Sequence, residues 1–173
     1  MPHPDPPDAA PPPKPDPKPK PPVGWREWVA LPGLAADPAA AAPHVKAKVD
    51  TGARTSSLHA FRVETFERDG VDLVRFEIHP RQKSKKDAVR CEAELIGVRE
   101  IKSSNGQVQA RPVVLAHAEV CGKRFPLELT LANRDAMGFR MLLGREALRG
   151  RFLVDPARSY LGGRFKSGSN RRV

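Results

Sequence analysis

The chain has 173 residues, with 19 prolines and only two cysteines, and it carries 30 lysines and arginines against 20 aspartates and glutamates. A chain of this length builds one small domain, and no stretch approaches the ~18 consecutive apolar residues of a membrane helix or forms the apolar core of a signal peptide. We therefore expect a cytoplasmic protein without a membrane partner, and two cysteines fit such a reducing compartment.

The first 22 residues are dominated by proline and contain few and small apolar side chains. Such a segment favours an extended, solvated polyproline conformation and adds nothing to a core. We expect a disordered Pro-rich tail over 1–22 that acts as a tether, with a ligand for SH3-type domains as the alternative. The ordered domain is expected over 23–163, followed by a basic disordered tail over 164–173.

Alternating apolar and polar residues predict strands at 25–31 and 45–49, on either side of an Ala- and Pro-rich loop. The second strand leads into Asp50-Thr51-Gly52-Ala53, which places a carboxylate on a tight turn just after a strand. Gly52 lacks a Cβ, so backbone or a bound water can come close to this turn. The alternative is an ordinary exposed aspartate in a turn.

Further along the chain, the pattern predicts more short strands. The chain leaves the turn at 57–60 and forms a hairpin of strands 63–68 and 72–79, turned at Asp69-Gly70. Strands follow at 89–98, 100–103, 108–120 and 124–131, then a short helix at 145–149 and a last strand at 154–159. Many short strands and one terminal helix predict an all-β fold, a small and partly closed β-barrel.

The run Met141-Leu142-Leu143-Gly144-Arg145 ends in glycine and opens the predicted helix. With Asp50-Thr51-Gly52-Ala53 and this run in this order, the chain resembles the retropepsin-like aspartic peptidases. It is similar in particular to a bacterial branch labelled "ATP-dependent zinc protease", which is found alongside ATP-grasp glutamate ligases of the ribosomal protein S6 type. The resemblance covers roughly Gly24 to Gly163.

The resemblance implies a retropepsin-like (acid protease) barrel in which Asp50, Thr51 and Gly52 are catalytic. Two carboxylates that share a site hold one proton between them and activate a water. The sequence has one Asp-Thr-Gly, and Asp135 and Asp155 lack the Thr-Gly of the turn, so the resemblance requires a homodimer with one Asp50 from each chain. The Thr51 hydroxyl would bond across the two-fold axis.

The resemblance also implies a substrate cleft covered by a hairpin from each chain. We place the tip of this lid at Ser103, Ser104, Asn105 and Gly106, with an ordinary surface turn as the alternative. Leu143 and Gly144 would pack beneath the catalytic turn. Ala53 and Arg54 would line the cleft, and the Arg54 cation predicts a preference for acidic peptides, including glutamate tails.

No His-Glu-x-x-His occurs, and the five histidines show no ligand spacing, so we expect no metal and no other cofactor. A composite site of His59, His117 and Cys121 is the alternative. There is no Walker loop for ATP and no serine-nucleophile elbow. The basic stretches 81–86 and 164–172 attract polyanions, yet no nucleic-acid-binding motif is present, and we do not expect nucleic acid as a partner.

Three hypotheses follow from these patterns. The first is a homodimeric aspartic endopeptidase that cleaves peptides or proteins, with acidic or glutamate-tailed substrates preferred. The second is a non-catalytic module of the same fold that binds a glutamate ligase or a ribosomal protein. The third is a basic adaptor for ribosome or RNA, in which Asp50 is only a turn residue.

Overall fold

The structure is a computed structural model that describes residues 19–81, 87–102, 106–133, 138–163 and 165, with Lys102 described in its backbone only. The elements in chain order are β1 (Pro22–Gly24), β2 (Arg26–Ala30), β3 (His44–Asp50), β4 (Ser56–His59), β5 (Phe61–Arg68), β6 (Val71–Ile78), β7 (Val89–Lys102), β8 (Val108–Val120), β9 (Lys123–Ala132), β10 (Met141–Gly144), α1 (Arg145–Leu148) and β11 (Leu153–Asp155). None of the helices in these residues is long and apolar enough to cross a membrane.

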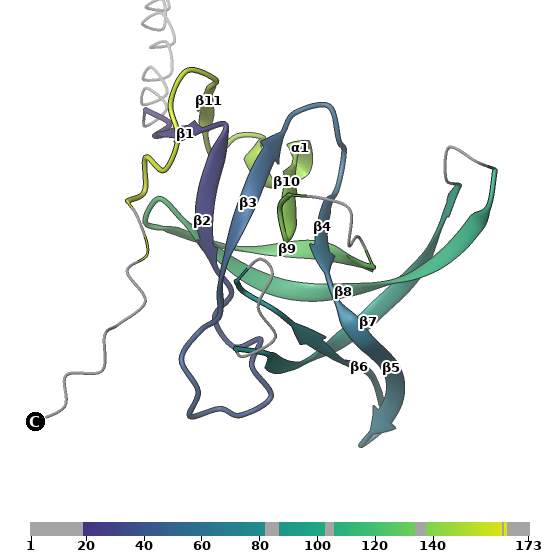
Figure 1. The fold of residues 1–173 in the computed structure, drawn as a ribbon. Coiled ribbons are helices and arrows are strands. Elements are labelled where there is room, and N and C mark those ends of the chain that lie inside the picture. Colours follow the sequence, from purple (N-terminus) through teal and green to yellow (C-terminus); the bar gives the residue numbers. More distant parts are fainter. Residues whose placement is uncertain (1–18, 82–86, 103–105, 134–137, 164, 166–173) are drawn as a thin grey trace, which may run out of the picture.

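One sheet closes on itself to form the barrel (Figure 1). The strand order is β2-β3-β10-β4-β9-β8-β7-β6-β5, and β8 also pairs with β2 through Ala30 and Glu119. One edge of β8 therefore serves two neighbours, with its C-terminal end facing β2 and its N-terminal half facing β7. The predicted all-β, partly closed barrel with one short C-terminal helix is confirmed.

Alternation along the strands fills the barrel with side chains. In β3, Val45, Ala47 and Val49 are buried, whereas Lys48 between them is exposed. The same alternation places Val114, Ala116, Ala118 and Val120 of β8 inside. Burial of one face fixes the register of each strand, because a shift by one residue would turn the apolar set outward. The register of β3 in turn fixes where Asp50 lies.

Two hairpins turn on residues in the left-handed conformation. Asp69 and Gly70 join β5 to β6 with φ of 53° and 75°, and Cys121 and Gly122 join β8 to β9 with φ of 47° and 75°. Positive φ at both central residues is the geometry of the tight type I′ turn. The hairpin predicted at Asp69-Gly70 is confirmed.

The structure corrects two strand predictions. The strands expected at 89–98 and 100–103 form one strand, β7, with an irregularity between Leu95 and Gly97. The last strand ends at Asp155 instead of reaching residue 159. Pro156 has no N–H to donate, and Asp155 Oδ1 accepts the Ala157 N–H at 2.9 Å, so the chain turns there.

Glu27 joins the beginning of the domain to its end. Its side chain is fully buried and accepts three backbone N–H groups, from Gly24 at 2.7 Å, Leu161 at 2.8 Å and Gly162 at 3.2 Å. The neighbouring β1 pairs in parallel with β11, a contact that the sequence did not predict. Hydrogen bonds to a buried carboxylate offset its loss of hydration and hold the C-terminal segment against β2.

Replacing Glu27 with Gln keeps the shape of the side chain but removes its charge and turns one acceptor into a donor that faces an N–H group. We expect the free energy of unfolding to fall by about 2 kcal/mol, the usual range for a hydrogen bond to a charged group. Urea unfolding of the variant measures this as a lower midpoint with an unchanged slope. Glu119→Gln, at an exposed position of β8, is the control and should stay within about 0.5 kcal/mol.

Candidate active site

Asp50 is the last residue of β3, and its carboxylate is held by the turn that follows. Oδ1 of Asp50 accepts the N–H groups of Gly52 and Ala53, both at 3.1 Å. Asp50 is half-buried, while Thr51 and Gly52 are exposed. The turn therefore fixes the orientation of the carboxylate and leaves it open to a ligand or a water.

β10 lies beneath this turn, between β3 and β4. It runs parallel to β3, with Leu143 opposite Val49 and Gly144 opposite Asp50. The Gly144 N–H donates to the buried Ser56 Oγ at 3.0 Å. A Cβ on Gly144 would lie 2.4 Å from the Thr55 carbonyl oxygen, so only glycine fits.

The first residues of α1 hold the other side of the turn. The N–H groups of Arg145 and Glu146 donate to the carbonyl oxygens of Ala53 at 2.8 Å and Arg54 at 3.0 Å. Nη1 of Arg145 donates to the Thr51 carbonyl oxygen at 3.1 Å. Sequence reasoning gave no role to Arg145 or Ser56. The only signal for Arg145 was its place directly after the apolar run that ends in Gly144.

A groove of about 710 Å³ lies beside this turn, between α1 and the sheet formed by β7, β8 and β9. Arg54 Nε is 3.8 Å from Glu146 Oε1, and Arg99 of β7 pairs with Glu128 of β9. Nη1 of Arg151 donates to the Glu146 carbonyl oxygen at 3.2 Å. The lining residues are Arg54, Thr55, Ser56, Arg99, Leu115, Pro126, Leu127, Glu128, Glu146, Ala147 and Arg151.

Of these groove residues, the sequence singled out Arg54 alone. Arg99 and Arg151 come from distant parts of the chain and have no local pattern to mark them. Ala53 lies in the turn, half-buried, with its carbonyl bonded to α1.

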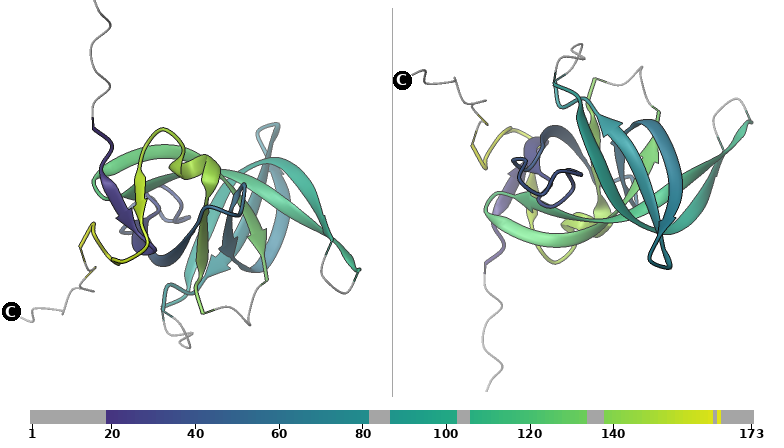
Figure 2. Two further views of the ribbon diagram at one scale, coloured as in Figure 1. Left: turned by 90° about the horizontal axis from the view of Figure 1, so that it is seen from above. Right: turned by 90° about the horizontal axis from the view of Figure 1, so that it is seen from below.

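The hairpin of β7 and β8 extends away from the barrel (Figures 1 and 2). Lys102 faces Val108, so the connection between the strands spans 103–107. The predicted tip residues Ser103, Ser104 and Asn105 lie outside the described residues. Gly106 is exposed, with φ of 82°. The predicted hairpin is present, and its role as a lid stays a prediction.

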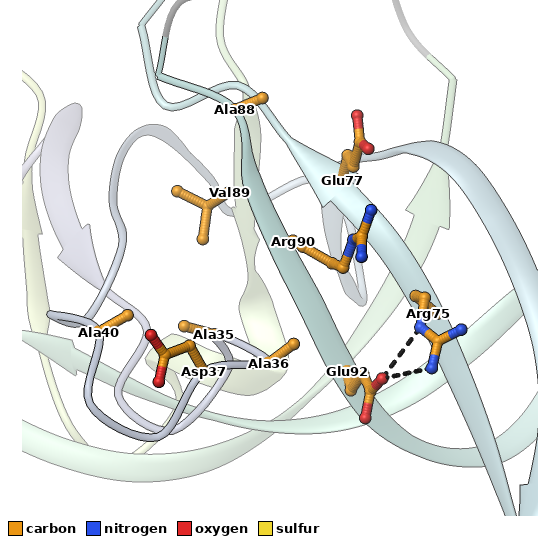
Figure 3. Close-up of a pocket in the computed structure, with 10 residues that line it drawn as sticks. All are labelled: Ala35, Ala36, Asp37, Ala40, Arg75, Glu77, Ala88, Val89, Arg90 and Glu92. Atoms are coloured by element: carbon orange, nitrogen blue, oxygen red, sulfur yellow. Dashed lines mark hydrogen bonds and ion pairs between the residues drawn. The ribbon is translucent and has the colours of Figure 1, made fainter.

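A second pocket lies between the loop after β2 and strands β6 and β7 (Figure 3). Arg75 donates twice to Glu92 Oε1, at 2.9 and 2.8 Å. This contact, together with Arg68, lowers the pKa of Glu92 below its usual value. The lining also includes Asp37, Glu77 and Arg90, and it contains none of the predicted site residues.

The cysteines and histidines do not form a cluster that could hold a metal in the described part of the chain. Burial raises the pKa of Cys91 to about 12, and burial followed by the Glu27 charge raises that of Cys121 to about 11. Both thiols are protonated at neutral pH, which disfavours a role as nucleophile. His59 is buried edge-on against Phe61, and the described residues contain no group of three or more metal-ligating side chains, so the alternative of His59, His117 and Cys121 is not assembled.

The sequence and the fold of this chain are both similar to those of known proteins. Residues 22–164 match the family model described as "Retropepsin-like aspartic endopeptidase RimB". A crystal structure of a Legionella pneumophila protein of unknown function superimposes with a TM-score of 0.67 and 28% sequence identity, covering 82% of this chain and 98% of that one.

Curated relatives carry a different name. The "Probable alpha-L-glutamate ligase" of Shewanella halifaxensis is 48% identical over 138 residues, which is 80% of this chain and 29% of the relative. The protein of the same name from Desulfotalea psychrophila is 46% identical over 78% of this chain and 28% of its own length. The chain thus spans less than a third of the length of these relatives.

The fit of Gly144 against Thr55 predicts the effect of a single methyl group. Gly144→Ala should lower the free energy of unfolding by about 1–3 kcal/mol, because backbone of the turn must move to admit the Cβ. Gly97→Ala is the control, since a Cβ there meets no atom within 4 Å. Thermal unfolding of both variants measures the difference, and equal stability of the two would contradict the close fit.

Proposed function

Because the chain belongs to the RimB-like family of retropepsin-like aspartic endopeptidases, we propose that it hydrolyses peptide bonds with a water activated by paired Asp50 carboxylates. The observation that carries the proposal is the placement of Asp50, half-exposed on a turn that β10 holds from below and α1 from the side. Thr51 and Gly52 complete the motif of this turn.

The two Asp50 carboxylates would have different roles in proton transfer. Two carboxylates in one site cannot both ionise cheaply, so one keeps a proton and the other accepts the proton of the attacking water. The water oxygen bonds to the carbonyl carbon, the carbon–nitrogen bond breaks, and a proton moves to the leaving nitrogen. Gly52, without a side chain, leaves space for the partner turn.

A homodimer supplies the second carboxylate in this proposal. The chain contains one Asp-Thr-Gly, and its described residues form one barrel. The small sheet of β1 and β11 lies at the same end of the molecule as α1 (Figure 1), and Leu153 of β11 is 61% exposed. Among the described residues, β11 has β1 as its one strand neighbour, and we propose that a second copy contacts this exposed strand.

The groove beside the turn supports an acidic substrate. Its lining contains three arginines and two glutamates, and arginine pairs well with carboxylates. The relatives that contain this domain within a longer chain are named glutamate ligases. We propose that the natural substrate is a protein with an acidic or glutamate-rich tail and that a glutamate ligase is a partner. We further propose that Ala53, Arg54 and the hairpin tip at Ser103, Ser104, Asn105 and Gly106 contact the peptide, while the buried Leu143 and Gly144 support the turn from below.

The ligase name of the relatives also favours a second function. A retropepsin-fold module without turnover would hold the acidic tail in the same groove and regulate the ligase. Both functions need the groove, and only the first needs the Asp50 carboxylate.

Asp50→Asn should abolish hydrolysis, by about a thousandfold or more, because an amide cannot accept the proton of the water. The measurement is digestion of a proteome-derived peptide library, supplemented with glutamate-tailed peptides, between mildly acidic and neutral pH. Asp72→Asn, at an exposed position of β6, is the matched control and should cleave like the wild type. Equal traces of cleavage with and without Asp50 would favour the binding module.

An active site built from two chains also predicts the activity of mixtures of wild type and the Asp50→Asn protein. When a fixed amount of wild type receives a tenfold excess of the Asp50→Asn protein, exchange of subunits should leave nearly all wild-type chains in mixed pairs. Activity per wild-type chain should then fall about tenfold, by mass action. An inert protein at the same concentration is the control. Undiminished activity after full exchange would contradict an active site built from two chains.

A further inference from the structure

Arg99 lies in the groove and is held by two residues of β9. Its Nη1 is 3.4 Å from Thr130 Oγ1, and its Nη2 pairs with the carboxylate of Glu128. Thr130 is buried, whereas the side chains of Arg99 and Glu128 are 36% and 52% exposed. The guanidinium is therefore anchored on the sheet, and its ion pair is open to solvent on the groove side.

A ligand carboxylate can replace Glu128 in this ion pair with little loss of free energy. Exposed ion pairs contribute little net free energy, because both partners are well hydrated when apart. If Glu128 swings away, its half-exposed carboxylate enters water. Arg99 keeps its contact with Thr130 and stays positioned for a new anion.

The surroundings of Arg99 favour an anion. Arg111 of β8 is the cross-strand partner of Arg99, so the two side chains lie on the same face of the hairpin. Arg54 and Arg151 line the same groove, where Glu128 and Glu146 are the acidic lining residues. One added carboxylate brings the charge of the lining to balance.

We propose that Arg99 is a specificity-determining residue that binds a side-chain carboxylate of the substrate, and that Glu128 occupies the same place in the free protein. The inference rests on the proposed function, which lays a peptide beside the Asp50 turn. An acidic peptide exchanges its carboxylate for that of Glu128. A neutral peptide leaves the Arg99–Glu128 pair intact and gains nothing from it.

Because the substrate carboxylate exchanges with that of Glu128, substitutions of Arg99 and of Glu128 should have opposite effects on binding. Loss of Arg99 removes the cation that the substrate needs. Loss of Glu128 removes the competitor and leaves the cation free for the substrate. A pair that served only to stabilise the hairpin would behave differently, because breaking it from either side would weaken binding in the same direction.

The test measures binding in the full chain with Asp50→Asn, so that no probe is consumed. The probes are a fluorescent peptide with four consecutive glutamates and the same peptide with four glutamines, followed by fluorescence anisotropy. Arg99→Gln should weaken binding of the glutamate peptide by roughly three- to tenfold, and Glu128→Gln should tighten it by roughly two- to fivefold. Neither substitution should alter the Kd of the glutamine peptide.

Arg124→Gln and Glu119→Gln are the matched controls. They are exposed, face each other across strands β8 and β9, and change the net charge by the same amounts as the two groove substitutions. Both should stay within about twofold of the Asp50→Asn parent, since distant surface charges are screened. Thermal unfolding of each variant verifies that it folds.

Each other outcome overturns the proposal. Weaker binding in both groove variants would assign the pair a structural role. Changes in Kd equal to those of the controls would show that only the net charge of the protein matters. A parent that does not bind the glutamate peptide would show that the groove does not take carboxylates. Failure of the proposed hydrolysis is separate, because a chain without peptidase activity would still show the opposite shifts in Kd.

Discussion

The close approach of Gly144 to the backbone of Thr55 is the contact on which the rest of the site depends. It lets β10 enter between β3 and β4, and it brings the first N–H groups of α1 to the carbonyls of the Asp50 turn. A turn held from below by a strand and from the side by a helix loses little further entropy when it binds a ligand. The turn that orients Asp50 is thus held in place by residues far from it in sequence.

Paired arginines line the groove beside that turn. The groove arginines come from the turn, from β7 and from the segment after α1, and each has an internal carboxylate or carbonyl partner. Such pairing keeps like charges compatible with a stable fold, because uncompensated cations at short range repel one another. It also leaves the groove ready to exchange an internal carboxylate for that of a ligand. In our proposal, the same side chains stabilise the fold and recognise the ligand.

The closed barrel explains why the hairpin of β7 and β8 can be both anchored and extended. One edge of β8 pairs with β2 at Glu119 and with β7 over its N-terminal half, so β7 leaves the barrel wall where β2 takes its place. Arg99 lies near the base of the extended part and contacts β9. In the longer curated relatives, the part similar to this chain makes up under a third of the length.

The sequence by itself determined the β-barrel, most strand positions and the Asp50 turn, because alternation and the turn residues at Asp69-Gly70 act over a few neighbours. It also marked Leu143 and Gly144, since an apolar run ending in glycine is a local pattern. Only the tertiary structure decided that Ser56 bonds to Gly144, that Glu27 joins both ends of the domain, and that Arg54, Arg99 and Arg151 share one groove. Those contacts join residues from separate strands and loops, and no local spacing in the sequence encodes which distant side chains the closure of a barrel brings together.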